Sequence, residues 1–293
     1  MSVQKLIAAL SAFALFALCG PSAAAPSPPS RFTVTVEGQG PDVILVPGLG
    51  SSREVWRGLA AGLAQTHRLH LVQIAGFAGV PAGANAQGPV IEPVADALAD
   101  YIAAQGLQAP AVVGHSLGGA IALMLGARHA GQVGRVVVVD ALPFYSLLMN
   151  PSATAESMQA QAKAAESAML DASPEQLAAM QEAAIARLVK TESARPALVQ
   201  MARDSDRQVF ARATYELMVT DLRPELAKVA APTLVIYSHD PAYGIGPERV
   251  DAWYRSLYGP VPAVTYQRID DSFHFIMLDQ PAAFDKAVEA FLR

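Results

Sequence analysis

The chain is almost without cysteine: among its 293 residues only Cys19 carries a thiol. Cys19 lies in an apolar segment near the N-terminus, ahead of the part of the chain that alternates strand-like and helix-like runs. If that segment is removed, the remaining chain has no cysteine. This excludes disulfide bonds and thiol nucleophiles from it.

Concentrated positive charge is missing as well. The formal net charge is −5, with 26 acidic residues against 21 Lys and Arg, and no run of basic residues stands out. Neutralising the phosphates of a nucleic acid requires clustered cations. We therefore expect no nucleic-acid partner.

Two kinds of cofactor motif are also absent from the sequence. The histidines and acidic residues do not have the spacing of metal ligands. No Gly-x-Gly-x-x-Gly sequence, which would cradle a phosphate, follows a strand-like run. The sequence thus predicts neither a metal nor any other cofactor.

The N-terminus has the features of an export signal. Lys5 precedes the apolar run LIAALSAFALFALC, and the small-residue stretch GPSAAAP follows that run. We predict a signal peptide over residues 1–25, cleaved after Ala24 or Ala25, and hence a periplasmic or secreted protein. An uncleaved anchor is the alternative, but the run is short and rich in alanine for a membrane span. We expect no stable membrane span after cleavage.

From residue 31 the chain alternates two kinds of run. Strand-like runs rich in Val, Ile and Leu are typical of buried parallel strands, and the stretches between them have helical composition. The strand-like runs are 31–37, 42–48, 68–74, 110–115, 134–142, 232–238 and 263–269, and the helical stretches are 53–65, 92–105, 117–130, 247–258 and 281–292. This alternation predicts an α/β fold with a doubly wound, mostly parallel sheet.

One region interrupts this alternation. Residues 141–230 contain no clear strand and are rich in Ala, Met, Gln and Glu, which favour helices. Within it, Ser173 followed by Pro174 predicts the start of a helix. We predict an α/β core over 26–140 and 231–293, with an all-helical cap of about four helices over 141–230 inserted above the carboxyl ends of the strands.

The stretch GHSLG, residues 114–118, joins a strand-like run to a helical one. A turn this tight forces its central residue into a strained conformation that costs about 1–3 kcal/mol. Gly114 and Gly118 let the backbone close around it, which leaves Ser116 exposed at a helix N-terminus. We interpret the stretch as a nucleophile elbow with Ser116 as the nucleophile. The alternative is a structural turn in which Ser116 only caps the helix.

A serine nucleophile needs a base, and the chain has six histidines. His274 follows the last strand-like run and precedes a helix that begins with proline, so it lies on a loop at the carboxyl ends of the strands. We predict His274 as the base. His239, which follows the run 232–238, is the alternative.

The layout resembles the α/β-hydrolase family with a helical cap, over residues 31–293. Three segments carry the resemblance, namely VPGLGSSREVW, VVGHSLGGAIALML and SFHFIMLDQPAAF. The family order of nucleophile, acid and histidine implies an acid between Ser116 and His274. Asp240 is the preferred candidate, although Ser238 stands where relatives usually have glycine and Asp240 comes early. Asp140, at the end of the run 134–142, is the reserve.

The resemblance also implies an oxyanion hole formed by two backbone N–H groups. One belongs to Leu117, which follows the nucleophile, and the other to Leu49 in the loop PGLGSS after the second strand-like run. Pro47 stands where the family often has histidine, a departure that leaves the amide of Leu49 in place.

A serine in the elbow excludes the dehalogenases and epoxide hydrolases of this family, which use a carboxylate there. We predict an exported serine hydrolase that cleaves carboxylic esters through an acyl-enzyme intermediate. An aminopeptidase related to the proline iminopeptidases is the alternative, and a non-catalytic ligand-binding protein is a third. An aminopeptidase would need acidic cap residues for a substrate amine, such as Glu156, Glu166 or Glu182.

The expected partner is a small molecule, an ester with an apolar acyl group. Apolar cap residues provide either an acyl pocket or the core of the cap itself. They are Leu147, Leu148, Met149, Met158, Met169 and Met180. The sequence leaves the acyl length and the oligomeric state open.

Overall fold

The computed structural model describes residues 30–293, which contain one sheet of seven strands. The predicted signal peptide lies outside the described residues. The strands are β1 (Phe32–Gly38), β2 (Asp42–Val46), β3 (Arg68–Ile74), β4 (Ala111–His115), β5 (Arg135–Val139), β6 (Thr233–His239) and β7 (Val264–Asp270). Each of the seven predicted strand runs is confirmed.

The order across the sheet is β1-β3-β2-β4-β5-β6-β7, and every pair is parallel except β1 with β3. The central strands β2, β4 and β6 are buried on both faces, which is why their sequences are continuous apolar runs. The antiparallel strand β1 lies at one edge and is partly exposed. The predicted doubly wound, mostly parallel sheet is therefore confirmed.

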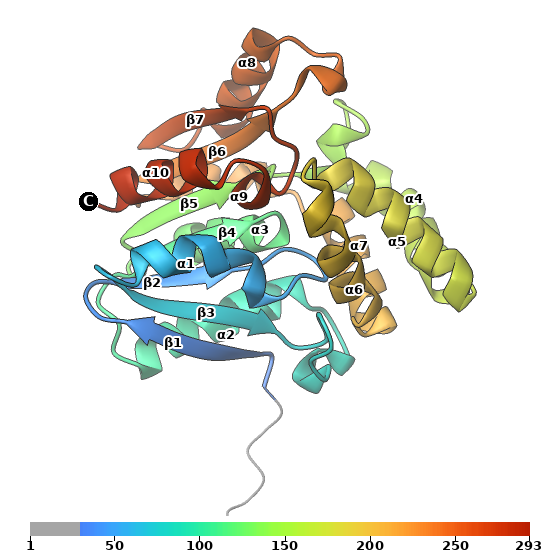
Figure 1. Cartoon of the computed structure of the whole chain (residues 1–293), viewed down its shortest axis with the longest axis horizontal. Coiled ribbons are helices and arrows are strands. Elements are labelled where there is room, and N and C mark those ends of the chain that lie inside the picture. The colour runs from blue at the N-terminus through green and yellow to red at the C-terminus, as the bar shows by residue number, and fades with distance from the viewer. Residues whose placement is uncertain (1–29) are drawn as a thin grey trace, which may run out of the picture.

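Helices cover both faces of this sheet (Figure 1). Side chains of α2, α3 and α8 form one core with the strands, and side chains of α1, α9 and α10 form a second core on the opposite face. These helices are α1 (Arg57–Leu63), α2 (Ile91–Ala104), α3 (Leu117–Arg128), α8 (Pro247–Tyr258), α9 (Ile276–Asp279) and α10 (Pro281–Leu292). Successive strand residues point into alternate cores, as Val43 and Ile44 do.

Short 3-10 helices occupy several of the connections. They are η1 (Arg53–Trp56), η2 (Gly83–Ala86), η3 (Tyr145–Leu148), η4 (Glu192–Ala194), η5 (Arg223–Lys228) and η6 (Pro241–Tyr243).

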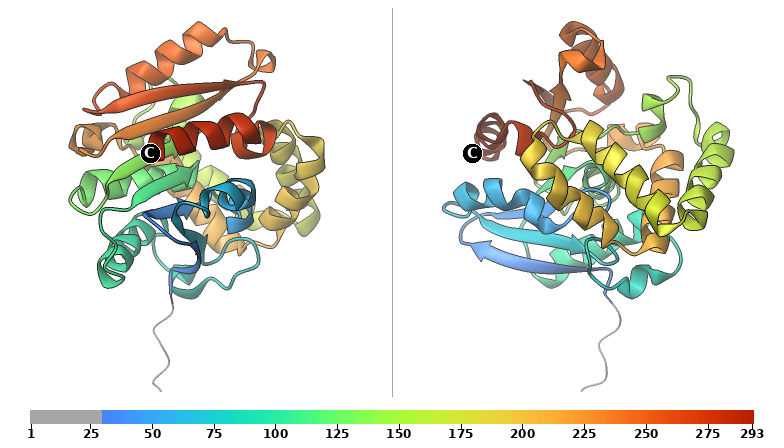
Figure 2. Two further views of the ribbon diagram at one scale, coloured as in Figure 1. Left: turned by 60° about the vertical axis from the view of Figure 1, so that its left-hand side comes forward. Right: turned by 45° about the vertical axis from the view of Figure 1, so that its right-hand side comes forward.

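Between β5 and β6 the described chain forms no strand, as predicted. Four α-helices fill this insertion: α4 (Ala155–Asp171), α5 (Pro174–Leu188), α6 (Arg195–Arg203) and α7 (Arg207–Val219). They gather at one end of the sheet, and Figure 2 shows them there from two further directions. The predicted start of α5 is confirmed, because Ser173 caps it through the backbone N–H of Gln176 and Pro174 is its first residue.

Residues 30–293 lack two kinds of feature. No helix in this part of the chain is both long and apolar enough to cross a membrane. Nor do three or more His, Cys, Asp or Glu side chains gather there in an arrangement suited to a metal ion.

Candidate active site

The turn between β4 and α3 holds Ser116 in a strained conformation. Its φ of 55° and ψ of −117° lie outside the regions that a residue with a side chain ordinarily adopts. A Cβ on Gly114 would collide with the carbonyl oxygen of Gly118, and one on Gly118 would collide with that of Val46. The two glycines are therefore required by close backbone contacts, and the geometry is that of the predicted elbow.

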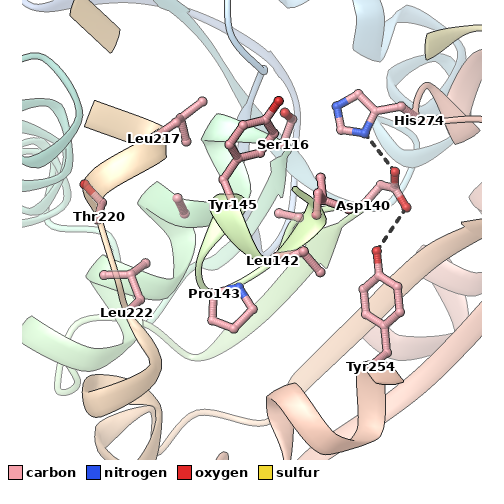
Figure 3. A pocket seen from close by; sticks show the side chains of 13 residues that line it. Ser116, Asp140, Leu142, Pro143, Tyr145, Leu217, Thr220, Leu222, Tyr254 and His274 are labelled. Atoms are coloured by element: carbon pink, nitrogen blue, oxygen red, sulfur yellow. Dashed lines mark hydrogen bonds and ion pairs between the residues drawn. The ribbon is translucent and has the colours of Figure 1, made fainter. Parts of the chain in front are cut away.

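His274 lies on the loop between β7 and α9 and is paired with Asp140. Its Nδ1–H donates to Asp140 Oδ2 over 2.7 Å. This contact fixes the tautomer of the imidazole and leaves Nε2 as the acceptor. In Figure 3 that second nitrogen points toward Ser116, and all three residues line the same cavity.

The preferred acid, Asp240, makes a different contact, and this prediction is wrong. Asp240 Oδ2 accepts a hydrogen bond from Lys190 Nζ over 2.8 Å, and Oδ1 accepts one from the backbone N–H of Ala242. The hydrogen bond from Lys190 lowers the pKa of the Asp240 carboxyl. The helical insertion supplies this cation, so Asp240 is bound by a partner from a distant part of the sequence.

Asp140, the reserve candidate, is held in place from two sides. It directly follows β5 with a φ of 44°, another conformation that side chains rarely adopt. Its Oδ1 accepts a hydrogen bond from the backbone N–H of Ser238 over 2.8 Å, and the hydroxyl of the buried Tyr254 lies 3.5 Å away. The carboxylate thus has one oxygen anchored to β6 and the other available to His274.

The alternative base, His239, is occupied elsewhere. Its Nδ1 lies 3.0 Å from Asp270 Oδ1, and its Nε2–H donates to the carbonyl of Ile245. His70 is likewise bound between Asp42 and Tyr101 at the other end of the sheet. Of the described histidines, His274 alone lines the cavity that contains Ser116.

His115, inside the elbow, contacts the loop that carries His274. The His115 side chain is fully buried, and its Nε2–H donates to the backbone carbonyl of His274 over 3.0 Å. Burial holds the pKa of His115 well below its usual value, so the ring is neutral. No local sequence pattern indicates that this ring anchors the backbone of His274.

The loop after β2 lies directly against Ser116. A Cβ on Gly48 would be 3.1 Å from Ser116 Cβ and 3.0 Å from His115 Nδ1, so a larger residue there would push against both side chains. The next amide is that of Leu49. Neither Leu49 N–H nor Leu117 N–H donates a hydrogen bond to another group of residues 30–293. Both predicted oxyanion donors are therefore without another acceptor in this part of the chain.

The helical insertion is tied to the His274 loop by a second carboxylate. Asp279 accepts hydrogen bonds from the backbone N–H groups of Lys190, Thr191 and Phe273, each between 2.8 and 3.0 Å. The ammonium group of Lys190 also forms ion pairs with Asp240 and Asp271. These bonds join the residues after α5 to the loop that positions His274, a link that no local sequence pattern indicates.

The cavity beside Ser116 is small, with a volume of about 80 Å³. Most of its lining is apolar and comes from the end of β5, the start of the insertion, α3 and the end of α7. The full lining is Ser116, Ala120, Asp140, Ala141, Leu142, Pro143, Tyr145, Leu148, Leu217, Thr220, Leu222, Tyr254 and His274.

Most of the apolar insertion residues predicted to form either an acyl pocket or the core of the cap do not line the cavity. Only Leu148 of that set lines the cavity. Leu147 and Met158 are buried in the core, whereas Met149 and Met180 are exposed on the surface. Composition alone does not show which face of a helix points toward Ser116.

Comparison with known proteins gives one family match and several relatives. A family model described as the alpha/beta hydrolase family matches residues 43–287. The pimeloyl-[acyl-carrier protein] methyl ester esterase of Aeromonas hydrophila is 33% identical over 115 residues, which is 39% of this chain and 43% of that protein. The chain thus matches less than half the length of this curated relative.

Two solved structures share the fold over most of their length. The enol-lactonase from Burkholderia xenovorans has a TM-score of 0.71 at 23% identity, covering 89% of this chain and 96% of that structure. A thermophilic esterase from Thermogutta terrifontis has a TM-score of 0.73 at 21% identity, covering 89% and 93%. At these identities the likeness extends to the fold alone.

Proposed function

This chain belongs to the alpha/beta hydrolase family, and from that premise we propose that it is a serine hydrolase that cleaves carboxylic esters. Ser116 is the nucleophile, His274 the general base and Asp140 the acid. The observation that carries this proposal is the contact of His274 Nδ1 with Asp140 Oδ2 at the cavity that Ser116 lines. The proposal takes Asp140 as the acid in place of Asp240 and keeps Ser116 and His274.

The geometry supports the usual two-step chemistry of a serine esterase. Ser116 Oγ attacks the ester carbonyl while His274 Nε2 takes the hydroxyl proton, and Asp140 stabilises the imidazolium that forms. The carbonyl oxygen becomes negative and accepts hydrogen bonds from the N–H groups of Leu49 and Leu117. His274 then gives the proton to the alcohol as the C–O bond breaks. In the second step His274 takes a proton from a water molecule, and the water oxygen bonds to the acyl carbon. The bond from that carbon to Ser116 Oγ then breaks, Oγ takes the proton back from His274, and the carboxylic acid leaves.

The lining of the cavity favours esters over peptides with a free amino terminus. Apart from Asp140, which is bound to His274, no acidic residue of the described chain lines it. Two of the glutamates considered for an amine site have cationic partners, since Glu166 pairs with Lys163 and Glu182 with Arg203. The relative from Aeromonas hydrophila is also named as an ester hydrolase.

The test is active-site labelling together with ester turnover. Wild-type protein should react with a fluorophosphonate probe at Ser116, as mass spectrometry of the labelled peptide would show, and should hydrolyse p-nitrophenyl esters. We expect Ser116→Ala to lose the label and on the order of 10⁶ in kcat. The control Ser256→Ala, at an exposed site on α8, should keep both. Labelling of a different residue, or turnover that survives in Ser116→Ala, would reject the proposal.

We propose further that the protein is exported to the periplasm or secreted, on the strength of the N-terminal sequence. Expression of the full chain in a bacterium, followed by fractionation and mass measurement, tests this. The mature protein should lack residues 1–24 or 1–25. A full-length chain confined to the cytoplasm would contradict it.

A further inference from the structure

We propose that the cavity beside Ser116 binds the acyl part of the substrate and accepts uncharged acyl groups of about three to four carbon atoms. This inference rests on the proposed function of Ser116, and it names the class of ester: short-chain, with a neutral acyl group. Three features of the cavity support it, namely its direction from Ser116, its volume and its lining.

The direction separates the acyl side of the site from the alcohol side. In Figure 3, His274 lies on one side of Ser116, while Leu217, Thr220 and Leu222 lie on the other. His274 must reach the oxygen of the leaving alcohol in order to protonate it, so the alcohol lies on the side of His274. The part of the cavity that extends away from His274 is then left for the acyl chain.

The volume limits the length of that chain. An apolar cavity of roughly 150 Å³ holds benzene, which has six carbon atoms. The cavity beside Ser116 has about 80 Å³, close to half that volume. Because the acyl chain can use at most this whole volume, the cavity holds no more than about three carbon atoms in addition to the carbonyl carbon bonded to Ser116 Oγ.

The lining determines which short acyl groups fit. Leu142 and Leu222 are buried and form apolar walls, with Leu217 beside them. No Lys or Arg of the described chain lines the cavity. A carboxylate at the end of the acyl chain would thus lose its hydration without gaining a cationic partner. The site accordingly excludes acyl groups that end in a negative charge.

The first measurement is the chain-length profile of the wild-type protein. We would measure kcat/KM for p-nitrophenyl acetate, propanoate, butanoate, hexanoate and octanoate, each below its solubility limit. Each methylene that still fits the cavity should raise kcat/KM by about fourfold. The profile should peak at propanoate or butanoate and fall at least tenfold by octanoate. The half-ester of a dicarboxylic acid should react at least tenfold more slowly than its neutral counterpart of equal length.

A pair of leucine substitutions tests whether this cavity sets the profile. Leu217→Ala removes side-chain volume from the acyl side and should move the peak to hexanoate. The matched control is Leu170→Ala on α4, because Leu170 is exposed and does not line the cavity. Leu170→Ala should keep the wild-type profile. Thermal melting of both variants would show that they are folded, and the wild-type profile decides the length limit even if Leu217→Ala does not fold.

The outcomes separate this inference from the proposed function. If no ester is turned over and no fluorophosphonate label is found, the proposed function fails and the acyl pocket fails with it. If Ser116 is labelled and kcat/KM stays level or rises through octanoate, the hydrolase stands and the short pocket is refuted. If instead kcat/KM for a series of butanoate esters peaks at a short alcohol while acyl length has no effect, the cavity binds the alcohol and the orientation is wrong.

Discussion

Replacing Asp140 by Asn is the sharpest test of the site, because it removes a charge and changes little else. In the wild type, Asp140 Oδ1 accepts from the backbone N–H of Ser238 and Oδ2 accepts from His274 Nδ1–H. An asparagine has only one side-chain oxygen. The Ser238 amide can only donate, so it takes this oxygen and leaves the asparagine NH₂ group facing His274.

The consequence is a change of tautomer at His274. An NH₂ group opposite Nδ1 requires Nδ1 to accept, which moves the ring proton to Nε2. Nε2 is then unable to take the proton of Ser116. The equivalent change in other serine hydrolases lowers kcat by about 10⁴, which corresponds to a barrier about 5 kcal/mol higher. We expect a loss of that order in Asp140→Asn.

Asp240→Asn is the matched control, since it makes the same chemical change one strand away. Its side chain is bound to Lys190 and to the backbone N–H of Ala242, not to His274. This substitution weakens the ion pair between the insertion and the core. It should lower the melting temperature modestly and reduce kcat less than tenfold.

The assay measures kcat, KM and the rate of fluorophosphonate labelling for both variants beside the wild type, with thermal melts to confirm folding. Asp140→Asn should lose kcat and labelling rate together while its KM changes little, because substrate binding does not need the carboxylate. If Asp240→Asn loses as much kcat as Asp140→Asn, the acid assigned from the structure is wrong.

Three further predictions follow from other contacts. Gly114→Ala should destabilise the fold by more than about 3 kcal/mol in denaturant unfolding, because its Cβ would meet the backbone of Gly118. The control Gly58→Ala lies on α1 with open space around it, and it should stabilise the fold by about 0.5–1 kcal/mol. Asp279→Ala should lower stability by about 2 kcal/mol and kcat by about tenfold at unchanged KM, since three backbone N–H groups beside the His274 loop lose their acceptor; an unchanged kcat would show that this link does not position His274. His115 stays neutral when folded but binds a proton below about pH 6.5 when unfolded, so the wild type should lose on the order of 2 kcal/mol relative to His115→Gln between pH 7 and pH 5; parallel pH-stability curves would contradict this.

Much of the fold was predictable because it depends on local patterns. Buried strands such as β5 are apolar runs, and helices such as α5 begin with a cap and a proline. The candidate nucleophile was predictable for a similar reason. The turn at Ser116 needs glycine on both sides, and this requirement is visible in five consecutive residues.

The candidate acid was harder to predict because two carboxylates lie at the carboxyl ends of neighbouring strands. Asp140 directly follows β5, and Asp240 directly follows β6. These two strands are neighbours in the sheet. Either residue therefore lies close to the loop that carries His274. The departures from the family pattern at Ser238 and Asp240 are local features of the sequence that count against Asp240.

The amino-acid sequence alone determined the α/β architecture, the elbow at Ser116 and the candidate base His274, because each depends on residues close together along the chain. Tertiary structure alone decided which carboxylate faces that base. Lys190 comes from the helical insertion, 50 residues before Asp240, and binds it, while the backbone N–H of Ser238 holds Asp140 toward His274. Such hydrogen bonds form only when donor and acceptor lie about 3 Å apart. Residues far apart in the sequence reach that distance only after their segments have packed together.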